Sequence, residues 1–228
     1  MPVFDYAVAA LTLGFIAYFF LSFSPSVIER WQAKGERAHA YYLVLYQRYV
    51  GVLCLGLLPA VGLLLLNHAP WTYGFRSSIT LYDLQWIGGL TLLILPVNYF
   101  NARKPDNLAM YPQIRLKEWT TSVVLHNILS WAAYLLAYEW LFRGLFLMSA
   151  AAILPASTAV LLTTALYAIA HIPKGIKETI GAIPLGLLLG YLTLRTQNLW
   201  IAWGVHVVLA LSNSFLSLYY HPDMRLKR

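Results

Sequence analysis

The stretch WTTSVVLHNILSWAAYLLAYEWLFRGLFLMSA, residues 119–150, decides the fold. It is mostly apolar and contains no proline. As one straight helix it is about 48 Å long, whereas the hydrocarbon core of a bilayer is about 30 Å thick. Two charged residues, Glu139 and Arg143, lie inside it. We interpret the stretch as a single tilted or broken membrane-spanning helix.

The composition of the whole chain agrees with a lipid environment. Of its 228 residues 60% are hydrophobic and 11% are charged, against about 25% charged in soluble domains. A globule of this size has too little interior to cover so much apolar surface. The composition therefore excludes an ordinary soluble domain and a disordered chain. The single cysteine, Cys54, lies in an apolar run and is expected to be a small core residue.

Runs long enough to cross a bilayer recur along the chain. They predict an all-α fold, a polytopic transmembrane helical bundle of about seven spans in one integral-membrane domain over residues 1–228. The expected spans are residues 4–24, 44–66, 84–100, 119–150, 156–172, 179–196 and 198–219.

The basic residues predict how this bundle is oriented. With seven spans, twelve Lys and Arg fall in loops on one side and two on the other. Dividing residues 119–154 into two spans would remove this asymmetry. The positive-inside rule then places the C-terminus in the cytoplasm and the N-terminus outside. We expect a multi-pass protein of a bacterial inner membrane that binds no nucleic acid, since the basic residues form short clusters between spans.

Ionisable residues at bilayer depth are costly and mark candidate functional positions. Glu139 and Arg143 are four residues apart, so their side chains meet on one helix face. Spacing alone leaves open that they form only a structural ion pair. His126 is expected to be a packing residue, and Arg48 an interfacial or snorkelling group.

The helical hairpin around Pro155 brings a histidine to the depth of Glu139. Glu139 and His171 are equally distant in sequence from Pro155, so in an antiparallel hairpin they face each other. His206 and Asn213 in the last span are seven residues apart and project from one helix face. Structural hydrogen bonding between helices is the alternative role for these residues.

These residues form motifs that resemble a known family. Tyr138-Glu139-Trp-Leu-Phe-Arg143-Gly resembles the Glu-Glu-x-x-x-Arg-Gly motif of the CAAX protease and bacteriocin-processing family, known as CPBP or Abi. Tyr167-Ala-Ile-Ala-His171 is similar to its Phe-x-x-x-His motif, and the segment from Leu185 to His206 resembles the approach to its third motif. The resemblance covers about residues 119–219, which we take as a CPBP-like catalytic core.

The chain departs from the family pattern at two positions. Tyr138 replaces the first glutamate of the first motif, and Ala210 stands where the final His-x-x-x-Asn motif has asparagine. The chain resembles a branch of the family with a single motif glutamate. In that branch Glu178 and Asn213 have counterparts, each seven positions after the histidine of the second or third motif.

The resemblance implies a glutamic-type intramembrane endopeptidase without metal or other cofactor. Glu139, His171, His206 and Asn213 are the catalytic candidates, with Arg143, Glu178 and Tyr138 in support. In this interpretation Glu139 activates water, His171 orients it or protonates the leaving amine, and His206 and Asn213 donate to the oxyanion. The partners would be the lipid bilayer and a membrane-protein or lipid-anchored peptide substrate.

The sequence leaves three other functions open. The chain could be a non-catalytic membrane protein, of immunity or scaffold type, that retains the family fold. It could be a zinc metalloprotease variant using Glu139, His171 and His206, although it has no His-Glu-x-x-His helix. A transporter with a buried proton relay is the third.

Overall fold

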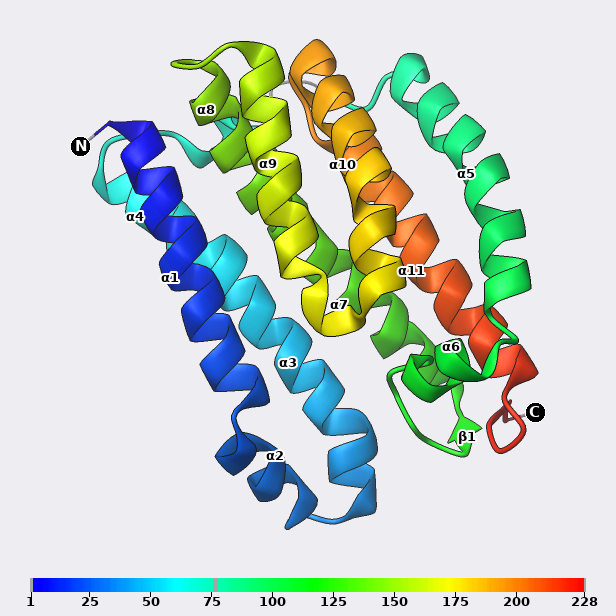
Figure 1. The fold of residues 1–228 in the computed structure, drawn as a ribbon. Helices are drawn as coiled ribbons and strands as arrows, with labels where there is room; N and C mark the ends of the chain where they lie inside the picture. Colours follow the sequence, from blue (N-terminus) through cyan, green and yellow to red (C-terminus); the bar gives the residue numbers. More distant parts are fainter. Residues whose placement is uncertain (1, 76–77, 228) are drawn as a thin grey trace.

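A computed structural model describes residues 2–75 and 78–227, and most of them are helical (Figure 1). The predicted all-α fold is confirmed. The principal helices are α1 (Val3–Phe23), α2 (Pro25–Gln32), α3 (Leu43–Val52), α4 (Leu58–Leu65), α5 (Leu81–Asn101), α6 (Pro105–Met110), α7 (Thr121–Glu139), α8 (Met148–Ala151), α9 (Ala156–Ala170), α10 (Ile176–Thr196) and α11 (Trp200–Tyr220). Wider π-helical segments, η1 (Ala38–Tyr42), η2 (Leu53–Leu57) and η4 (Trp140–Leu147), join several of them, and η3 (Pro70–Thr72) and η5 (Ile172–Lys174) are 3₁₀ turns.

Seven helical segments correspond to the seven predicted spans. Val3–Gln32, Ala38–Leu65, Ile176–Thr196 and Trp200–Tyr220 are each long and apolar enough to cross a membrane. The others are α5, the run from α7 to α8, and α9. Large aliphatic side chains on the outside of the bundle are exposed, such as Leu65 (79%) and Leu92 (74%). The chain is therefore an integral membrane protein.

Residues 121–151 form a single interrupted helix, as the sequence predicts for residues 119–150. α7, η4 and α8 follow one another without a turn from Thr121 to Ala151. Every residue of η4 is buried. A π-helical segment inside an α-helix is frequently found at a functional site, and this one begins directly after Glu139.

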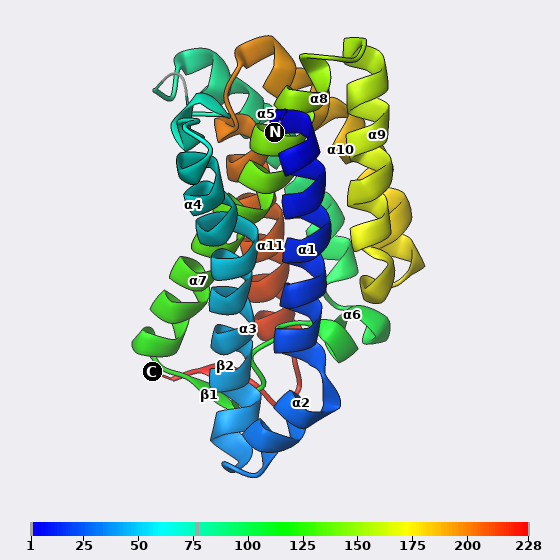
Figure 2. The same cartoon turned by 90° about the vertical axis from the view of Figure 1, so that its left-hand side faces the viewer.

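The helices pack as two groups on either side of α7. Figures 1 and 2 show α1 beside α3 and α4 on one side, while α9 packs along α10 and α5 along α11 on the other. α7 contacts both α3 and α11. The main core cluster is centred on residues from the end of α7 and from η4, such as Tyr138, Phe142 and Phe146.

Short local signals fix where the helices begin and end. Thr80 and Asp83 form a reciprocal capping box at the start of α5, and the Thr120 hydroxyl accepts from the backbone N–H of Val123 at the start of α7. Each cap satisfies a backbone donor that the first helical turn leaves free. Gly175, with φ of +93°, turns the chain between η5 and α10, in a conformation that costs a residue with a side chain more than glycine.

The length of α9 creates space inside the bundle. Its 15 residues span about 22 Å, less than the hydrocarbon core of a bilayer. Figure 1 shows the turn from α9 to α10 part-way along the bundle, with α6 below it. The end of α9 therefore lies part-way along the bundle, where His171 is buried while Ile169 and Ile172 are exposed.

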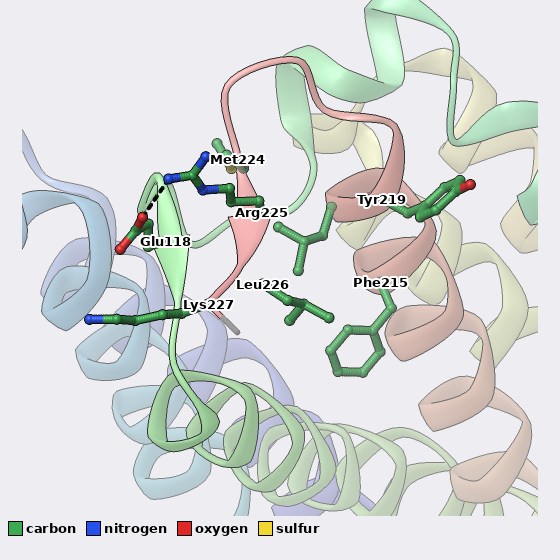
Figure 3. Close-up of a pocket in the computed structure, with 8 residues that line it drawn as sticks. Glu118, Phe215, Tyr219, Met224, Arg225, Leu226 and Lys227 are labelled. Atoms are coloured by element: carbon green, nitrogen blue, oxygen red, sulfur yellow. Dashed lines mark hydrogen bonds and ion pairs between the residues drawn. The ribbon is translucent and has the colours of Figure 1, made fainter.

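The C-terminal tail is tied to the start of α7. Strand β2 (Arg225–Leu226) pairs in parallel with β1 (Glu118–Trp119), and Arg225 donates to Glu118 Oε1 over 2.8 Å. A hollow lies between this pair and α11, lined by Phe215, Tyr219 and Leu226 among others (Figure 3). No predicted site residue lines this hollow.

Candidate active site

Glu139 and Arg143 form a fully buried ion pair where α7 meets η4. Arg143 Nη1 donates to Glu139 Oε2, and the two side chains are 1% and 0% exposed. The four-residue spacing that predicts this contact on a helix face is confirmed. Charges inside a membrane protein persist only when they are paired or hydrogen bonded, and each of these residues provides the other's partner.

His206 from α11 completes the surroundings of the carboxylate. Its Nδ1 lies 2.7 Å from Glu139 Oε1, and the residue is 5% exposed. Because an ionised carboxylate can only accept, Nδ1 carries the proton and donates. In the neutral ring Nε2 is then an acceptor. Glu139 thus holds His206 in the tautomer that a general base requires.

His171 ends α9 and lies against the same cluster. Its Nδ1 is 2.8 Å from the Tyr167 carbonyl oxygen, which can only accept, so Nε2 of the neutral ring is again an acceptor. The rings of His171 and His206 are stacked, with centroids 6.4 Å apart and planes 27° apart. The hairpin places His171 beside Tyr138 and His206, and His206 is the histidine that hydrogen bonds to Glu139.

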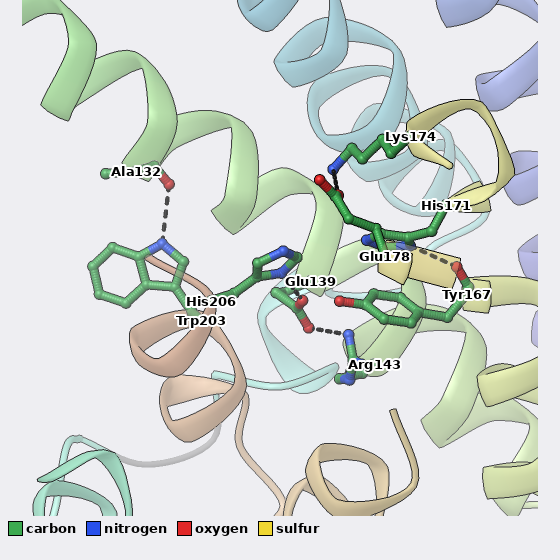
Figure 4. A network of polar contacts seen from close by, with 9 residues as sticks. All are labelled: Ala132, Glu139, Arg143, Tyr167, His171, Lys174, Glu178, Trp203 and His206. Carbon is green, nitrogen blue, oxygen red and sulfur yellow. Dashed lines mark hydrogen bonds and ion pairs between the residues drawn. The ribbon is translucent and has the colours of Figure 1, made fainter. Parts of the chain in front are cut away.

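A cavity of about 580 Å³ opens in front of the two histidines. Its walls come from α5, α6, α7, α9, α10 and α11. The polar side chains around it include Tyr167, His171, Lys174, Glu178, His206 and Asn213. Among the described residues, Glu139, Arg143 and Tyr138 do not line the cavity. The carboxylate therefore lies behind His206, as Figure 4 also shows.

Charged and phenolic groups gather at one end of the cavity. The Tyr111 hydroxyl donates to Glu178 Oε1 over 2.8 Å, and Lys174 Nζ lies 3.8 Å from Glu178 Oε2. Burial, with the Glu178 carboxylate beside it, holds the pKa of Tyr111 well above its usual value. Lys177 donates to Asp106, which ties α10 to α6. Glu178 therefore belongs to this end of the cavity, away from Glu139.

Asn213 and Tyr138 occupy different parts of the site. Asn213 lines the cavity, and its Oδ1 accepts from Ser217 Oγ over 3.5 Å. Tyr138 is 5% exposed and packs edge-on against both histidines, at centroid distances of 6.2 and 6.0 Å. At the position of the missing motif glutamate, the chain thus has an aromatic wall behind the histidines.

The prediction that Arg48 snorkels to the interface is wrong. It is 3% exposed and donates to Asn127 Oδ1, Ser130 Oγ and Gln113 Oε1 at 3.1, 2.8 and 3.0 Å. Its helical run begins at Ala38 rather than at residue 44, so Arg48 lies about 15 Å along that run. His126, predicted to be a packing residue, hydrogen bonds to Tyr41.

Two members of the site could not be predicted from the motifs. Tyr167 stands where the family motif has phenylalanine, and this replacement is a visible signal in the sequence. Tyr111 has no such signal, because only the fold brings it to Glu178. In the part of the chain that the structure describes, no group of three or more His, Cys, Asp or Glu side chains is arranged to hold a metal ion.

The chain is a helical membrane protein in which two histidines line a cavity and a buried carboxylate lies behind one of them. Residues 119–212 match the family of type II CAAX prenyl endopeptidase Rce1-like proteins. The match confirms the predicted resemblance to the CPBP family in the region that carries the site, and it ends one residue before Asn213. This family implies an intramembrane endopeptidase of the CAAX-protease type. No match is found among curated proteins or among solved structures.

Proposed function

We propose that this chain is an intramembrane endopeptidase in which the Glu139–His206 pair activates the hydrolytic water. The observation that carries the proposal is the 2.7 Å contact between Glu139 Oε1 and His206 Nδ1, with His206 on the cavity wall. A carboxylate behind a histidine fixes the ring and stabilises its protonated form. From the sequence, Glu139 itself is the expected water activator and His206 an oxyanion donor; in this proposal His206 is the base and Glu139 acts through it.

The first step is attack by water. His206 Nε2 removes one proton, while His171 Nε2 accepts a hydrogen bond from the other and orients the water. The oxygen forms a bond to the scissile carbonyl carbon, and the carbonyl π electrons move to its oxygen. Glu139 remains a carboxylate and stabilises the His206 imidazolium.

The second step breaks the peptide bond. The protonated His206 Nε2 gives its proton to the departing nitrogen, the C–N bond breaks, and the oxyanion collapses to a carboxylic acid. The products are this acid and an amine, and His206 returns to its neutral form. No net charge is left in the apolar surroundings at the end of the cycle.

Asn213 and Glu178 take supporting roles in this proposal. Asn213 lies seven residues from His206, about 10 Å along α11. We assign its amide to the backbone of the bound substrate rather than to the reacting carbonyl. Glu178, held by Tyr111 and near Lys174, orders the end of the cavity through which the substrate enters.

The substrate class follows from the position of the cavity. It is bounded by transmembrane helices and by α6, so a peptide must arrive from the membrane or its immediate surface. We propose a membrane-protein segment or a lipid-anchored peptide. The basic clusters near α2, α6 and the β pair support a cytoplasmic location for this end of the molecule.

The direct test measures cleavage by the purified protein in liposomes containing EDTA. Membrane-anchored candidate peptides are added, and products are identified by mass spectrometry. Glu139→Gln and His206→Gln are each expected to lower the rate about 100-fold or more, the range for loss of general-base catalysis. His126→Gln, outside the cluster, is the control and should keep the wild-type rate.

Three other outcomes would contradict the proposal. Cleavage that stops in EDTA and returns only with zinc indicates the metalloprotease alternative. Folded Glu139→Gln protein with full activity shows that the pair is structural. A wild-type protein that is folded and cleaves none of the peptides, yet sustains a cellular phenotype unaffected by Glu139→Gln, indicates the non-catalytic alternative.

A further inference from the structure

Tyr167 is a cavity residue to which the mechanism above gives no role. It lies on α9 one turn before His171, is 1% exposed and lines the cavity. Its carbonyl accepts from His171 Nδ1, and its ring lies 4.5 Å from the His171 ring, centroid to centroid. The resembled motif has phenylalanine at this position, so the hydroxyl is a feature of this chain.

The phenol lies beside the Glu139–His206 pair. Figure 4 shows its oxygen on the side of Glu139 and His206, and its ring centroid is 6.2 Å from that of His206. The guanidinium carbon of Arg143 lies 4.3 Å from the Tyr167 ring centroid. A neighbouring cation in a low-dielectric site makes a phenol a stronger hydrogen-bond donor.

The proposed reaction needs such a donor. Attack on the carbonyl places negative charge on its oxygen, and a preorganised donor aimed at that oxygen is a large source of rate acceleration. Both histidines have their Nδ1 protons committed, to Glu139 and to the Tyr167 carbonyl. Their Nε2 atoms are acceptors before attack, so neither neutral ring can donate to the carbonyl.

On α11, the position nearest to His206 offers no other donor for the oxyanion. One turn after His206, the cavity wall carries Ala210, which has no polar side-chain atom. Asn213 lies farther along α11, and Arg143 lies behind the cavity wall. Of the described side chains that line the cavity, Tyr167 combines an O–H donor with contact to the His171 ring.

We infer that the Tyr167 hydroxyl is a catalytic donor that binds the oxyanion formed during peptide hydrolysis, an inference that rests on the proposed function. The O–H donates to the carbonyl oxygen as charge develops and keeps its proton throughout. Arg143 then has two roles: it neutralises Glu139 and increases the donor strength of the phenol.

Tyr167→Phe tests the inference because it removes the oxygen and keeps the ring. We expect kcat to fall by about 100-fold to 1000-fold, as for loss of one oxyanion donor, with KM within about threefold of wild type because the hydroxyl acts on the transition state. The lower limb of the pH–rate profile should stay in place, since the Glu139–His206 contact is untouched. Tyr134→Phe, which removes a phenol from the same aromatic cluster but not from the cavity, is the control.

A second variant keeps the test informative if Tyr167→Phe lowers stability. Tyr167→Phe combined with Ala210→Asn places an amide donor on the cavity wall one turn from His206, and we expect it to recover part of the lost kcat. The melting temperature of every variant is measured beside its rate.

The outcomes separate this inference from the proposed function. If wild type cleaves, Glu139→Gln is inactive and Tyr167→Phe retains full kcat, the oxyanion assignment is overturned and the protease proposal stands. A rise in KM alone, or a shifted lower pH limb, assigns Tyr167 to substrate binding or to positioning of His206 and also overturns it. If wild type does not cleave, the proposed function fails first.

Discussion

At the scale of single residues, Glu139 shows how a charge is retained inside a membrane protein. Its two oxygens accept from Arg143 and His206, and all three residues are buried. Removing water from each charge is costly, and the pair offsets this cost only while both partners are present. Loss of one member should therefore destabilise the protein more than loss of both.

A double-mutant comparison tests this expectation. Glu139→Ala leaves Arg143 buried without its anion and should lower the free energy of unfolding by about 3–5 kcal/mol. Glu139→Leu combined with Arg143→Met should cost clearly less, because no charge is then left unpaired. Unfolding in mixed micelles of increasing denaturing detergent measures both. Equal losses for single and double variants would show that the pair contributes little.

At the scale of helices, the close contact of α9 with α10 positions His171. Gly186 faces Thr164 so closely that a Cβ on the glycine would lie 2.9 Å from Thr164 Cγ2. A larger side chain must push the two helices apart or rotate them. Since His171 ends α9, such a shift also moves its ring relative to His206.

Gly186→Leu should therefore lower stability by about 1–3 kcal/mol, the usual cost of overpacking, and should reduce cleavage. Gly88→Ala is the matched control, because a Cβ there meets nothing within 4 Å. This control should be neutral or slightly stabilising, since alanine favours a helix more than glycine does. The melting temperatures of both variants measure this difference in stability. A normal Gly186→Leu melting temperature would mean that the helices adjust freely.

The contact between α6 and α10 is expected to depend on pH. The hydrogen bond from Lys177 holds the pKa of Asp106 below its usual value. A carboxyl whose pKa is lowered by folding stabilises the docked state above its unfolded pKa, about 3.9, and loses that contribution as the pH falls through the folded value. Docking of α6 should thus weaken at acidic pH and be complete near neutrality.

Hydrogen exchange of residues 105–110 between about pH 5 and pH 3 measures this effect. Protection of α6 should fall with pH in the wild type, after correction for intrinsic exchange rates. In Asp106→Asn protection should be lower at neutral pH and nearly constant over that range. Asp5→Asn, on the exposed side of α1, should behave as wild type. If Asp106→Asn keeps the wild-type pH response, that response belongs to another titratable group.

At the scale of the whole molecule, the basic residues and the architecture predict one orientation. α2, α6 and the β pair gather at one end of the bundle (Figure 1), and most of the loop Lys and Arg are near them in sequence. The opposite end holds η3 and the start of α9. The positive-inside rule assigns the first end to the cytoplasm.

Single cysteines in a Cys54→Ser background test this orientation. In intact cells an impermeant maleimide should label Trp71→Cys, next to the outer end of α4. It should label Lys34→Cys, after α2, only once the membrane is opened. Both native side chains are exposed. The reverse pattern would overturn the orientation, and labelling of both in intact cells would indicate a damaged membrane.

The sequence alone is enough to predict the helices, their membrane environment and the pairing of Glu139 with Arg143. These features depend on apolar run length and on backbone geometry within one helix, which are local and fixed by residue spacing. The sequence also predicts a similar depth for His171 and Glu139, because both are equally far from Pro155 in the hairpin. Only the tertiary structure decided that His206 contacts the carboxylate, that Arg48 is buried, and that Tyr111 and Tyr167 join the cavity. Such contacts depend on helix tilt, on the short length of α9 and on packing between helices far apart in sequence, and residue spacing carries no information on these.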